Sequence, residues 1–325
     1  MFMPIRRRLL LALTATACLS AASPAFAADA QAVRLVVPYP AGGPADIVAR
    51  AIAQPLSEAL GRTLLVDNRP GASGMIGATS VARAAPDGST LLLNPSIHVI
   101  LPSLRPNVTY RPVDDFTHLG VTVGVPLILA INNDLPVNSV EELVAYAKQH
   151  PGRLSFATSS LGSSSHLAGE QLKMMAGIDI LHVPYKGSAP AITDLIGGQV
   201  QIMFDSLPSI LPFVKTGRVR ALAVTTPQRA AAMADLKTME EAGFQGFNHT
   251  NWYGMWGPAD MPAGVSAPLI AALQKAMARP DLRARLLELG AQPIDGLYGD
   301  QFKRFAVSET ERYAKLIKET GIRLE

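Results

Sequence analysis

Short apolar runs alternate with longer amphipathic stretches along the chain. The apolar runs, rich in Val, Ile and Leu, have strand lengths, and the stretches between them repeat apolar residues at helical spacing. The expected strands are 33–38, 63–66, 90–93, 154–157, 181–184, 200–204 and 221–225. The expected helices are 46–60, 75–84, 140–149, 166–175 and 189–196. This order predicts an α/β fold built from βαβ units.

A passage with Pro102, Pro106 and Pro112 divides the alternation into two α/β units, and from Pro262 the pattern is helical, at 265–278, 281–289 and 301–320. Helices without strands must cover a sheet built elsewhere, so we expect this tail to return to the first unit. The expected organisation is listed by residue range: a signal peptide at 1–27, a discontinuous domain 1 at 28–128 plus 254–325, and domain 2 at 129–253. Two crossings, near 125–132 and 251–257, would form a hinge that permits closure around a ligand.

The first 27 residues have the order of a secretory signal. A basic segment, Arg6 to Arg8, precedes an apolar segment of eleven residues and the small-residue site Ala25-Phe26-Ala27. This order predicts export to the periplasm with cleavage near Ala27. Lipidation of Cys18 is the alternative, although the residues before it lack the leucine expected at a lipoprotein site.

Cleavage after Ala27 removes three of the 29 basic side chains and no acidic one, so 26 basic face 26 acidic groups in the mature chain. Such a balance argues against a nucleic-acid partner, which requires clustered Lys and Arg. The single cysteine leaves with the signal, which excludes disulfides and thiol chemistry in the mature protein. No feature requires an oligomer, and we expect a monomer.

The first candidate site is the segment Tyr39-Pro40-Ala41-Gly42-Gly43-Pro44-Ala45-Asp46, a strand end that turns through two glycines into a helix. Glycines let backbone N–H groups approach an anion closely, and the helix N-terminus adds partial positive charge. Asp46 is expected to cap that helix. An ordinary βα turn explains the same residues without any ligand.

The second candidate repeats this design at Pro70-Gly71-Ala72-Ser73-Gly74. The glycine spacing differs from the dinucleotide fingerprint, so no nucleotide cofactor is expected. Two such turns at neighbouring strand ends form the place where open α/β sheets bind ligands, and together they favour an anion clamp. Arg69 could pair with a ligand carboxylate, but we favour a structural role in bonding loop carbonyls.

A hydroxyl-rich loop, residues 158–165, precedes the helix that carries His166 and Glu170. Its hydroxyls could hold the far end of a ligand, or one of them could simply cap the helix. The spacing of His166 and Glu170 suits a metal, but no third ligand is evident and we expect none. A hydrolase using this loop and His166 is the alternative function, although the chain has no G-x-S-x-G elbow.

Two further segments follow expected strands, Tyr185-Lys186-Gly187-Ser188 and Phe204-Asp205-Ser206. Their polar groups should therefore reach the same face as the loops described above. An acid such as Asp205 beside an anion site could repel wrong ligands or accept a hydrogen bond from the right one. A capping role for Asp205 is the alternative.

The chain resembles the Bug family, the extracytoplasmic receptors of tripartite tricarboxylate transporters. The resemblance spans the whole mature chain and is carried by segments 39–50, 67–72, 182–187 and 195–200, among them Tyr-Pro-Ala-Gly-Gly-Pro-Ala-Asp and His-Val-Pro-Tyr-Lys-Gly. It implies a periplasmic-binding-protein-like Venus flytrap of two α/β domains joined by a two-crossing hinge. It further implies no catalytic activity, no cofactor, a carboxylate-bearing organic acid as ligand and membrane transporter subunits as partners.

Carried over by position, the resemblance also implies the ligand-binding residues. Those of the first loop are Tyr39, Ala41, Gly42, Gly43 and Asp46. Those of the second loop are Ala72, Ser73 and Gly74. Ser159, Ser163 and Asp205 would face them from domain 2. Ser73, Met75 and Ser188 depart from residues frequent in the family, so the far half of the site could take a different acid.

Overall fold

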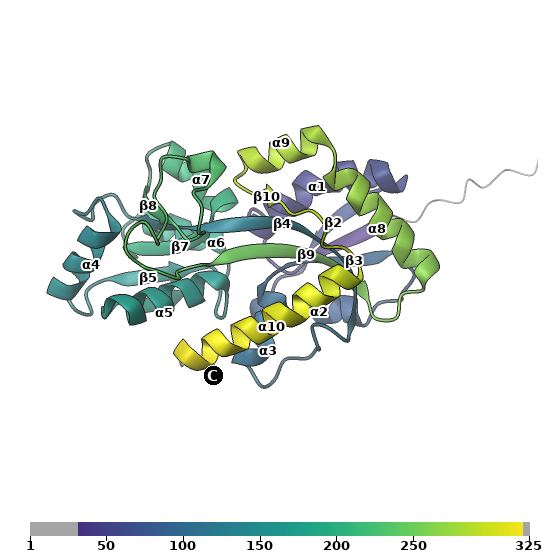
Figure 1. Ribbon diagram of the computed structural model, residues 1–325, viewed down its shortest axis with the longest axis horizontal. Coiled ribbons are helices and arrows are strands. Elements are labelled where there is room, and N and C mark those ends of the chain that lie inside the picture. Colours follow the sequence, from purple (N-terminus) through teal and green to yellow (C-terminus); the bar gives the residue numbers. More distant parts are fainter. Residues whose placement is uncertain (1–31, 321–325) are drawn as a thin grey trace, which may run out of the picture. The chain divides into compact units, whose positions relative to one another are not determined.

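The computed structural model describes residues 32–320, and the expected signal peptide with its cleavage site and Cys18 lies outside them (Figure 1). The strands are β1 Val33–Val37, β2 Leu64–Asn68, β3 Thr90–Pro95, β4 Phe116–Ile131, β5 Ser155–Thr158, β6 Leu181–Pro184, β7 Ile202–Ser206, β8 Arg220–Val224, β9 Thr250–Pro258 and β10 Gln292–Pro293. The helices are α1 Pro44–Leu60, α2 Met75–Ala82, α3 Ile97–Leu104, α4 Val140–Gln149, α5 Ser164–Ala176, α6 Ser188–Ile196, α7 Leu207–Lys215, α8 Ala263–Met277, α9 Pro280–Glu288 and α10 Asp300–Thr320. Two 3₁₀ turns are η2 Ala72–Gly74 and η3 Ala231–Met233.

Strand β4 belongs to two groups of strands. In the first group β1 pairs in parallel with β2 and β3, and β9 lies antiparallel between β3 and β4. In the second group β4 pairs with β7 and β8, and β5 lies in parallel with β6 and β7. The change of partners falls between Pro126 and Leu127, and Figure 1 shows β4 and β9 running side by side where the groups meet.

Each group of strands has its own core on both faces. Helices α1 and α8 cover one face of the first group, where Val48 and Ile52 pack with Leu269 and Leu273. Helices α3 and α10 cover its other face. Helices α4 and α5 lie on one face of the second group, and α6 and α7 on the other. The expected division into 28–128 plus 254–325 and 129–253 stays a prediction.

The expected α/β fold is confirmed, and every strand and helix named from the sequence lies within two residues of its observed bounds. Helix α3 and strands β4, β9 and β10 were not named from the sequence; α3 ends in the proline-rich passage, which leads into β4. Pro102 lies within α3, whose residues Ile97 to Leu101 are buried. Helix α7 was also missed, although Pro208 sits in its first turn, where proline is tolerated.

Gly169 in α5 allows this helix to pack directly on the buried ring of Phe156, which a Cβ at position 169 would overlap. We expect Gly169→Ala to lower the free energy of unfolding by about 1 to 3 kcal/mol, the usual cost of overpacking. Urea denaturation measures this change. The matched control is Gly264→Ala in α8, where a Cβ meets nothing within 4 Å and alanine should stabilise slightly. Equal effects of the two substitutions would contradict the packing argument.

Candidate functional site

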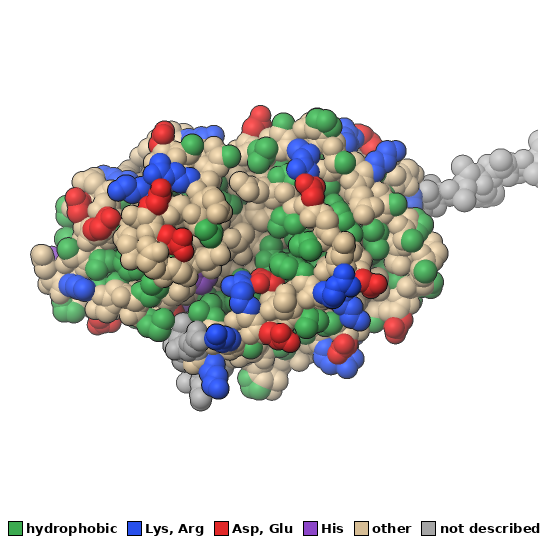
Figure 2. Space-filling view, viewed as in Figure 1, with side chains coloured by type: hydrophobic (Ala, Val, Ile, Leu, Met, Phe, Trp, Pro, Cys, Tyr) green, Lys and Arg blue, Asp and Glu red, His purple; other side chains and the backbone are tan. Residues whose placement is uncertain are grey.

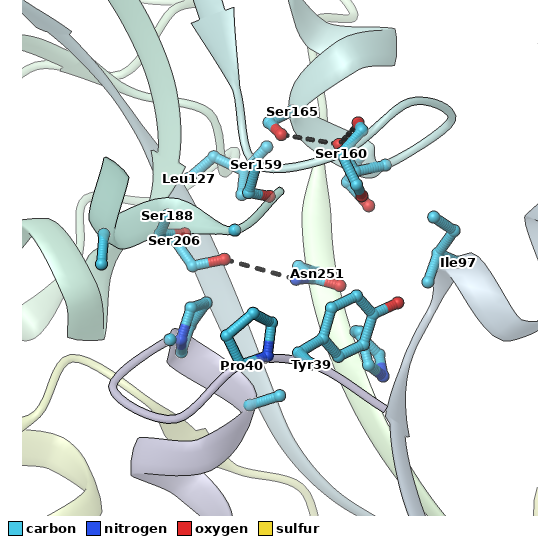
Figure 3. Close-up of a pocket in the computed structure, with 18 of the residues that line it drawn as sticks. Tyr39, Pro40, Ile97, Leu127, Ser159, Ser160, Ser165, Ser188, Ser206 and Asn251 are labelled. Carbon is cyan, nitrogen blue, oxygen red and sulfur yellow. Dashed lines mark hydrogen bonds between the residues drawn. The ribbon is translucent and has the colours of Figure 1, made fainter. Parts of the chain in front are cut away.

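A cavity lies among the loops that follow β1, β5 and β6, and the starts of five helices line it (Figure 3). The lining residues at helix starts are Gly43, Pro44 and Ala45 at α1, Ile97 at α3, Ser163, Ser164 and Ser165 at α5, Gly187, Ser188, Ala189 and Pro190 at α6, and Ser206 at α7. The other lining residues are Tyr39, Pro40, Ala41, Pro95, Leu127, Ser159, Ser160, Asn251 and Tyr253.

The lining contains no charged side chain among the described residues. Its polarity comes from hydroxyls, one amide and the backbone N–H groups at the helix starts. Helices α1, α3, α6 and α7 have no side-chain cap, so their first-turn N–H groups keep free hydrogen-bonding capacity. A convergence of helix N-termini without a cation favours an anion held by backbone donors.

The cavity is small. Its volume is about 50 Å³, and a single water molecule requires about 10 to 15 Å³. Ser159 and Ser160 lie on one side of the cavity and Tyr39 and Pro40 on the opposite side, with Asn251 between them (Figure 3). This space suits a small organic molecule.

The first glycine loop is only partly at the cavity. Tyr39, Ala41 and Gly43 line it, whereas Gly42 and Asp46 do not. The carboxylate of Asp46 accepts the Gly42 N–H at 2.9 Å and pairs with Arg50 at 2.9 Å. Asp46 therefore fixes the loop that precedes the helix and is not a cap of the first turn. Burial acts to raise the Asp46 pKa, but hydrogen bonds from Arg50, Gly42 and Asn68 outweigh it and lower the pKa.

The second glycine loop lies beside the cavity, because Ala72, Ser73 and Gly74 are absent from its lining. Ala72 and Ser73 have φ angles of 47° and 56°, a conformation rare for residues other than glycine. Ser73 Oγ donates to the carbonyl of Leu161 at 3.2 Å, and its own carbonyl accepts the Tyr39 hydroxyl at 3.4 Å. The second loop thus links the first loop to the hydroxyl-rich loop.

Arg69 has the structural role favoured above, with a different partner. Its Nε donates to the Asp67 carboxylate at 2.8 Å, and Arg69 does not line the cavity. The contact holds the chain after β2 and leaves no basic side chain at the cavity among the described residues.

Of the other three expected site residues, Ser159, Ser163 and Asp205, two line the cavity and one does not. Ser159 and Ser163 line the cavity, and Ser163 is also the N-cap of α5. Asp205 does not reach it, because its side chain lies buried beneath Ser188, whose hydroxyl donates to Asp205 Oδ1 at 2.7 Å. Burial raises the pKa of Asp205 to about 6, although hydrogen bonds from Ser209 and Ser188 act to lower it.

His182 is a third residue near His166 and Glu170, and the possible ligand atoms of the three lie within 4.8 Å of one another. The two imidazole rings stack at 4.0 Å with an angle of 14° between them, so one metal ion cannot lie in both ring planes. His166 Nδ1 also accepts the Gly162 N–H, and Lys173 pairs with Glu170. This geometry suits a packed pair of neutral histidines.

No hydrogen bond of the described residues joins the His166 side chain to a serine hydroxyl. Burial, followed by the charge of Lys173, lowers the pKa of His166 to about 4. The arrangement therefore lacks the pair of nucleophile and base that a serine hydrolase requires.

Several lining residues were missed by the sequence reasoning, among them Pro95, Ile97, Leu127, Asn251 and Tyr253. Pro95 ends β3 and Ile97 follows it, so both could have been found from the rule that ligands bind at the carboxyl ends of parallel strands. Asn251 and Tyr253 lie on the antiparallel strand β9, for which that rule gives no signal.

Residues 48–322 match the family model described as tripartite tricarboxylate transporter family receptor. Protein BugT of Bordetella pertussis is 33% identical over 313 residues, 96% of each chain. The periplasmic binding protein BugD is 37% identical with a TM-score of 0.86, over 90% of this chain and 98% of that one. Rpa4515 of R. palustris, solved with adipate, is 37% identical with a TM-score of 0.87 over the same shares.

Proposed function

The chain belongs to the tripartite tricarboxylate transporter family of receptors, and from this premise we propose that it captures a small carboxylate-bearing organic acid in the cavity and presents it to the membrane subunits of such a transporter. The observation that carries the proposal is the convergence of five helix starts on an uncharged cavity. A carboxylate there would accept hydrogen bonds from backbone N–H groups, each charge-assisted bond contributing about 1.5 to 3 kcal/mol.

Closure around the acid would involve the loops of both groups of strands. Ser73 contacts Leu161, and Ser96 at the start of α3 contacts Ser164 at the start of α5, with 3.0 Å between the hydroxyl oxygens. We propose that these contacts form when the acid has docked on the β1–α1 loop, and that β4 and β9 act as the hinge. Contacts made only in the closed form would supply the free energy of closure.

In this proposal the chain acts in the periplasm as a monomer, after cleavage near Ala27, and requires no cofactor or metal. We expect it to catalyse no reaction, as the receptor family implies. No helix within residues 32–320 has the length and apolarity needed to span a membrane.

A thermal-shift screen of the mature protein tests the proposal with mono-, di- and tricarboxylic acids, amino acids and aromatic acids of similar size. We expect at least one acid to stabilise the protein by about 2.7 kcal/mol at a hundredfold excess over its Kd. The control is the methyl ester or amide of the same acid, which lacks the charge and should have little effect. A screen in which no acid raises the melting temperature would refute the proposed function.

A further inference from the structure

The hydroxyls around the cavity can be sorted by where their protons go. A serine hydroxyl has one proton to donate and two lone pairs that accept. When the neighbouring group can only accept, the serine must donate its proton to that group. The serine oxygen can then only accept a hydrogen bond from a ligand in the cavity. The partners of Ser163, Ser164, Ser165 and Ser188 settle this direction for each of them.

Ser188, at the first position of α6, is the clearest case. Its Oγ lies 2.7 Å from Oδ1 of Asp205, which is 1% exposed and also accepts from the Ser209 hydroxyl. An ionised carboxylate cannot donate, so the single proton of Ser188 is committed to Asp205. Ser188 lines the cavity and therefore offers it only lone pairs.

The serine hydroxyls at the start of α5 also donate their protons to neighbouring protein groups. Ser163 donates to the carbonyl of Ser160 at 2.8 Å, so in its 2.8 Å contact with Ser165 the proton must come from Ser165. Ser96 likewise donates to Asn251 Oδ1 at 2.9 Å, so Ser164 is the donor in its contact with Ser96. The hydroxyl protons of Ser164 and Ser165 are thus unavailable to a ligand.

The cavity consequently presents three kinds of group. The N–H groups at the helix starts donate, and the oxygens of Ser164, Ser165 and Ser188 can only accept. The hydroxyls of Ser159 and Ser160 make no hydrogen bond among the described residues and can do either. A plain carboxylic acid, once ionised, offers only acceptors and forms no hydrogen bond with the oxygens that can only accept, whereas a ligand that carries a donor gains one.

We infer that the ligand carries, in addition to its carboxylate, a hydrogen-bond donor, either a hydroxyl or an ammonium group, which binds Ser188 Oγ at the start of α6. This inference rests on the proposed function and narrows it from organic acids in general to hydroxy acids and amino acids. Asp205 decides between the two donors, because a buried negative charge one hydroxyl away from the donor favours an ammonium group.

Calorimetric titration of the mature protein with matched trios of acids tests the inference. Each trio shares one carbon skeleton of three to six carbons and differs only at the second carbon, which carries hydrogen, hydroxyl or ammonium; succinate, malate and aspartate form one such trio. We expect the hydroxy or amino member of the best-binding trio to bind at least about tenfold more tightly than the plain acid.

Two substitutions assign that preference to its residues. Ser188→Ala should reduce the preference to within about twofold, because it weakens binding of the hydroxy and amino members more than binding of the plain acid. Asp205→Asn should weaken the amino acid more than the hydroxy acid if the donor is an ammonium group. The matched control is Thr193→Val on the exposed face of α6, whose hydroxyl contacts the Ala189 carbonyl and does not reach the cavity.

The results of these titrations test the donor inference and the proposed receptor function separately. If the plain acid binds as tightly as its hydroxy and amino counterparts, the donor inference is wrong and the receptor function stands. If no acid of any trio or of the wider screen binds, the proposed function fails and the inference fails with it. The affinities of the wild-type protein for the three members of a trio test the donor inference even if a variant does not fold.

Discussion

Replacement of Ser159 by leucine is expected to weaken acid binding at least about a hundredfold, a loss of about 2.7 kcal/mol, with little change in the melting temperature. Ser159 lies in the wall of the cavity between the start of α5 and the start of α6 (Figure 3). A leucine side chain adds two methyl groups and a branch to a cavity of about 50 Å³. The acid and the leucine cannot both occupy this volume.

The fold should tolerate this leucine because no hydrogen bond of the described residues uses the Ser159 hydroxyl; its carbonyl, which accepts the Gly187 N–H at 2.8 Å, is retained. Calorimetry with the best acid from the screen measures the loss. Ser159→Ala is the matched control, since it removes the same hydroxyl without adding volume and should cost less than about tenfold. Binding by the leucine variant at wild-type affinity would place the site elsewhere.

Acidification is expected to unfold the protein cooperatively, with a midpoint between about pH 4 and 5.5 at 25 °C. Four histidines, His98, His118, His166 and His249, are buried. Burial, followed by nearby positive charges, lowers the pKa of His98 and His249 to about 3 and of His118 and His166 to about 4.

Stability falls with falling pH because the folded and the unfolded protein bind different numbers of protons. Below about pH 6.5 an unfolded histidine binds a proton that the folded one refuses, so stability falls as pH falls from 6.5 toward 4. The loss is about 1.4 kcal/mol per pH unit for each histidine, or about 3 to 5 kcal/mol in all for each, against a total stability of about 5 to 15 kcal/mol. Asp205 opposes this trend, because its raised pKa favours the folded state as pH falls from 6 to 4, by about 3 kcal/mol.

Fluorescence of Trp252 and Trp256, recorded in urea at a series of pH values, measures the slope of unfolding free energy against pH. His118→Phe should reduce that slope by about 1.4 kcal/mol per unit, since His118 Nε2 has no hydrogen-bond partner among the described residues and the ring packs on Phe302. Equal slopes for wild type and His118→Phe would rule out this histidine as a source of acid sensitivity.

The elements that could be predicted from the sequence are those whose apolar residues follow a single period. Helix α1 and strand β1 are examples, because each buries one face or both faces in a regular pattern. Strand β4 was not predicted, since Gly120, Gly124 and Pro126 interrupt its sequence and its two halves pair with different strands. Helix α3 was hidden by Pro102, although Ile97 to Leu101 and Leu104 of this helix are buried.

The candidate site shows the same limit. Gly43, Ser159 and Ser163 could be predicted as site residues because each lies where a strand end turns into a helix, and the local sequence determines where a helix starts. The side-chain directions of Asp46 and Asp205 depend instead on partners that lie close only after folding, Arg50 and Asn68 for the first and Ser188 for the second. Polar residues near a strand end could be located from sequence, but whether each one faces the cavity could not.

Figure 2 shows Lys and Arg interspersed with Asp and Glu over the visible face, as the charge balance of the mature sequence suggests. Charges of mixed sign keep a surface soluble without creating a field for a polyanion. Any recognition by a transporter would then depend on local shape and specific contacts.

The place of β9 between β3 and β4 constrains how the chain is made. During synthesis, the ribosome releases β3 and β4 more than a hundred residues before the strand that joins them, so the first group of strands cannot be completed until residue 258 has emerged. Until then both strands present unpaired edges, the feature that invites aggregation or capture by a chaperone. The nascent chain should therefore reach its native structure only after nearly all of it has been translated, which also keeps it unfolded long enough to be threaded through a secretion channel.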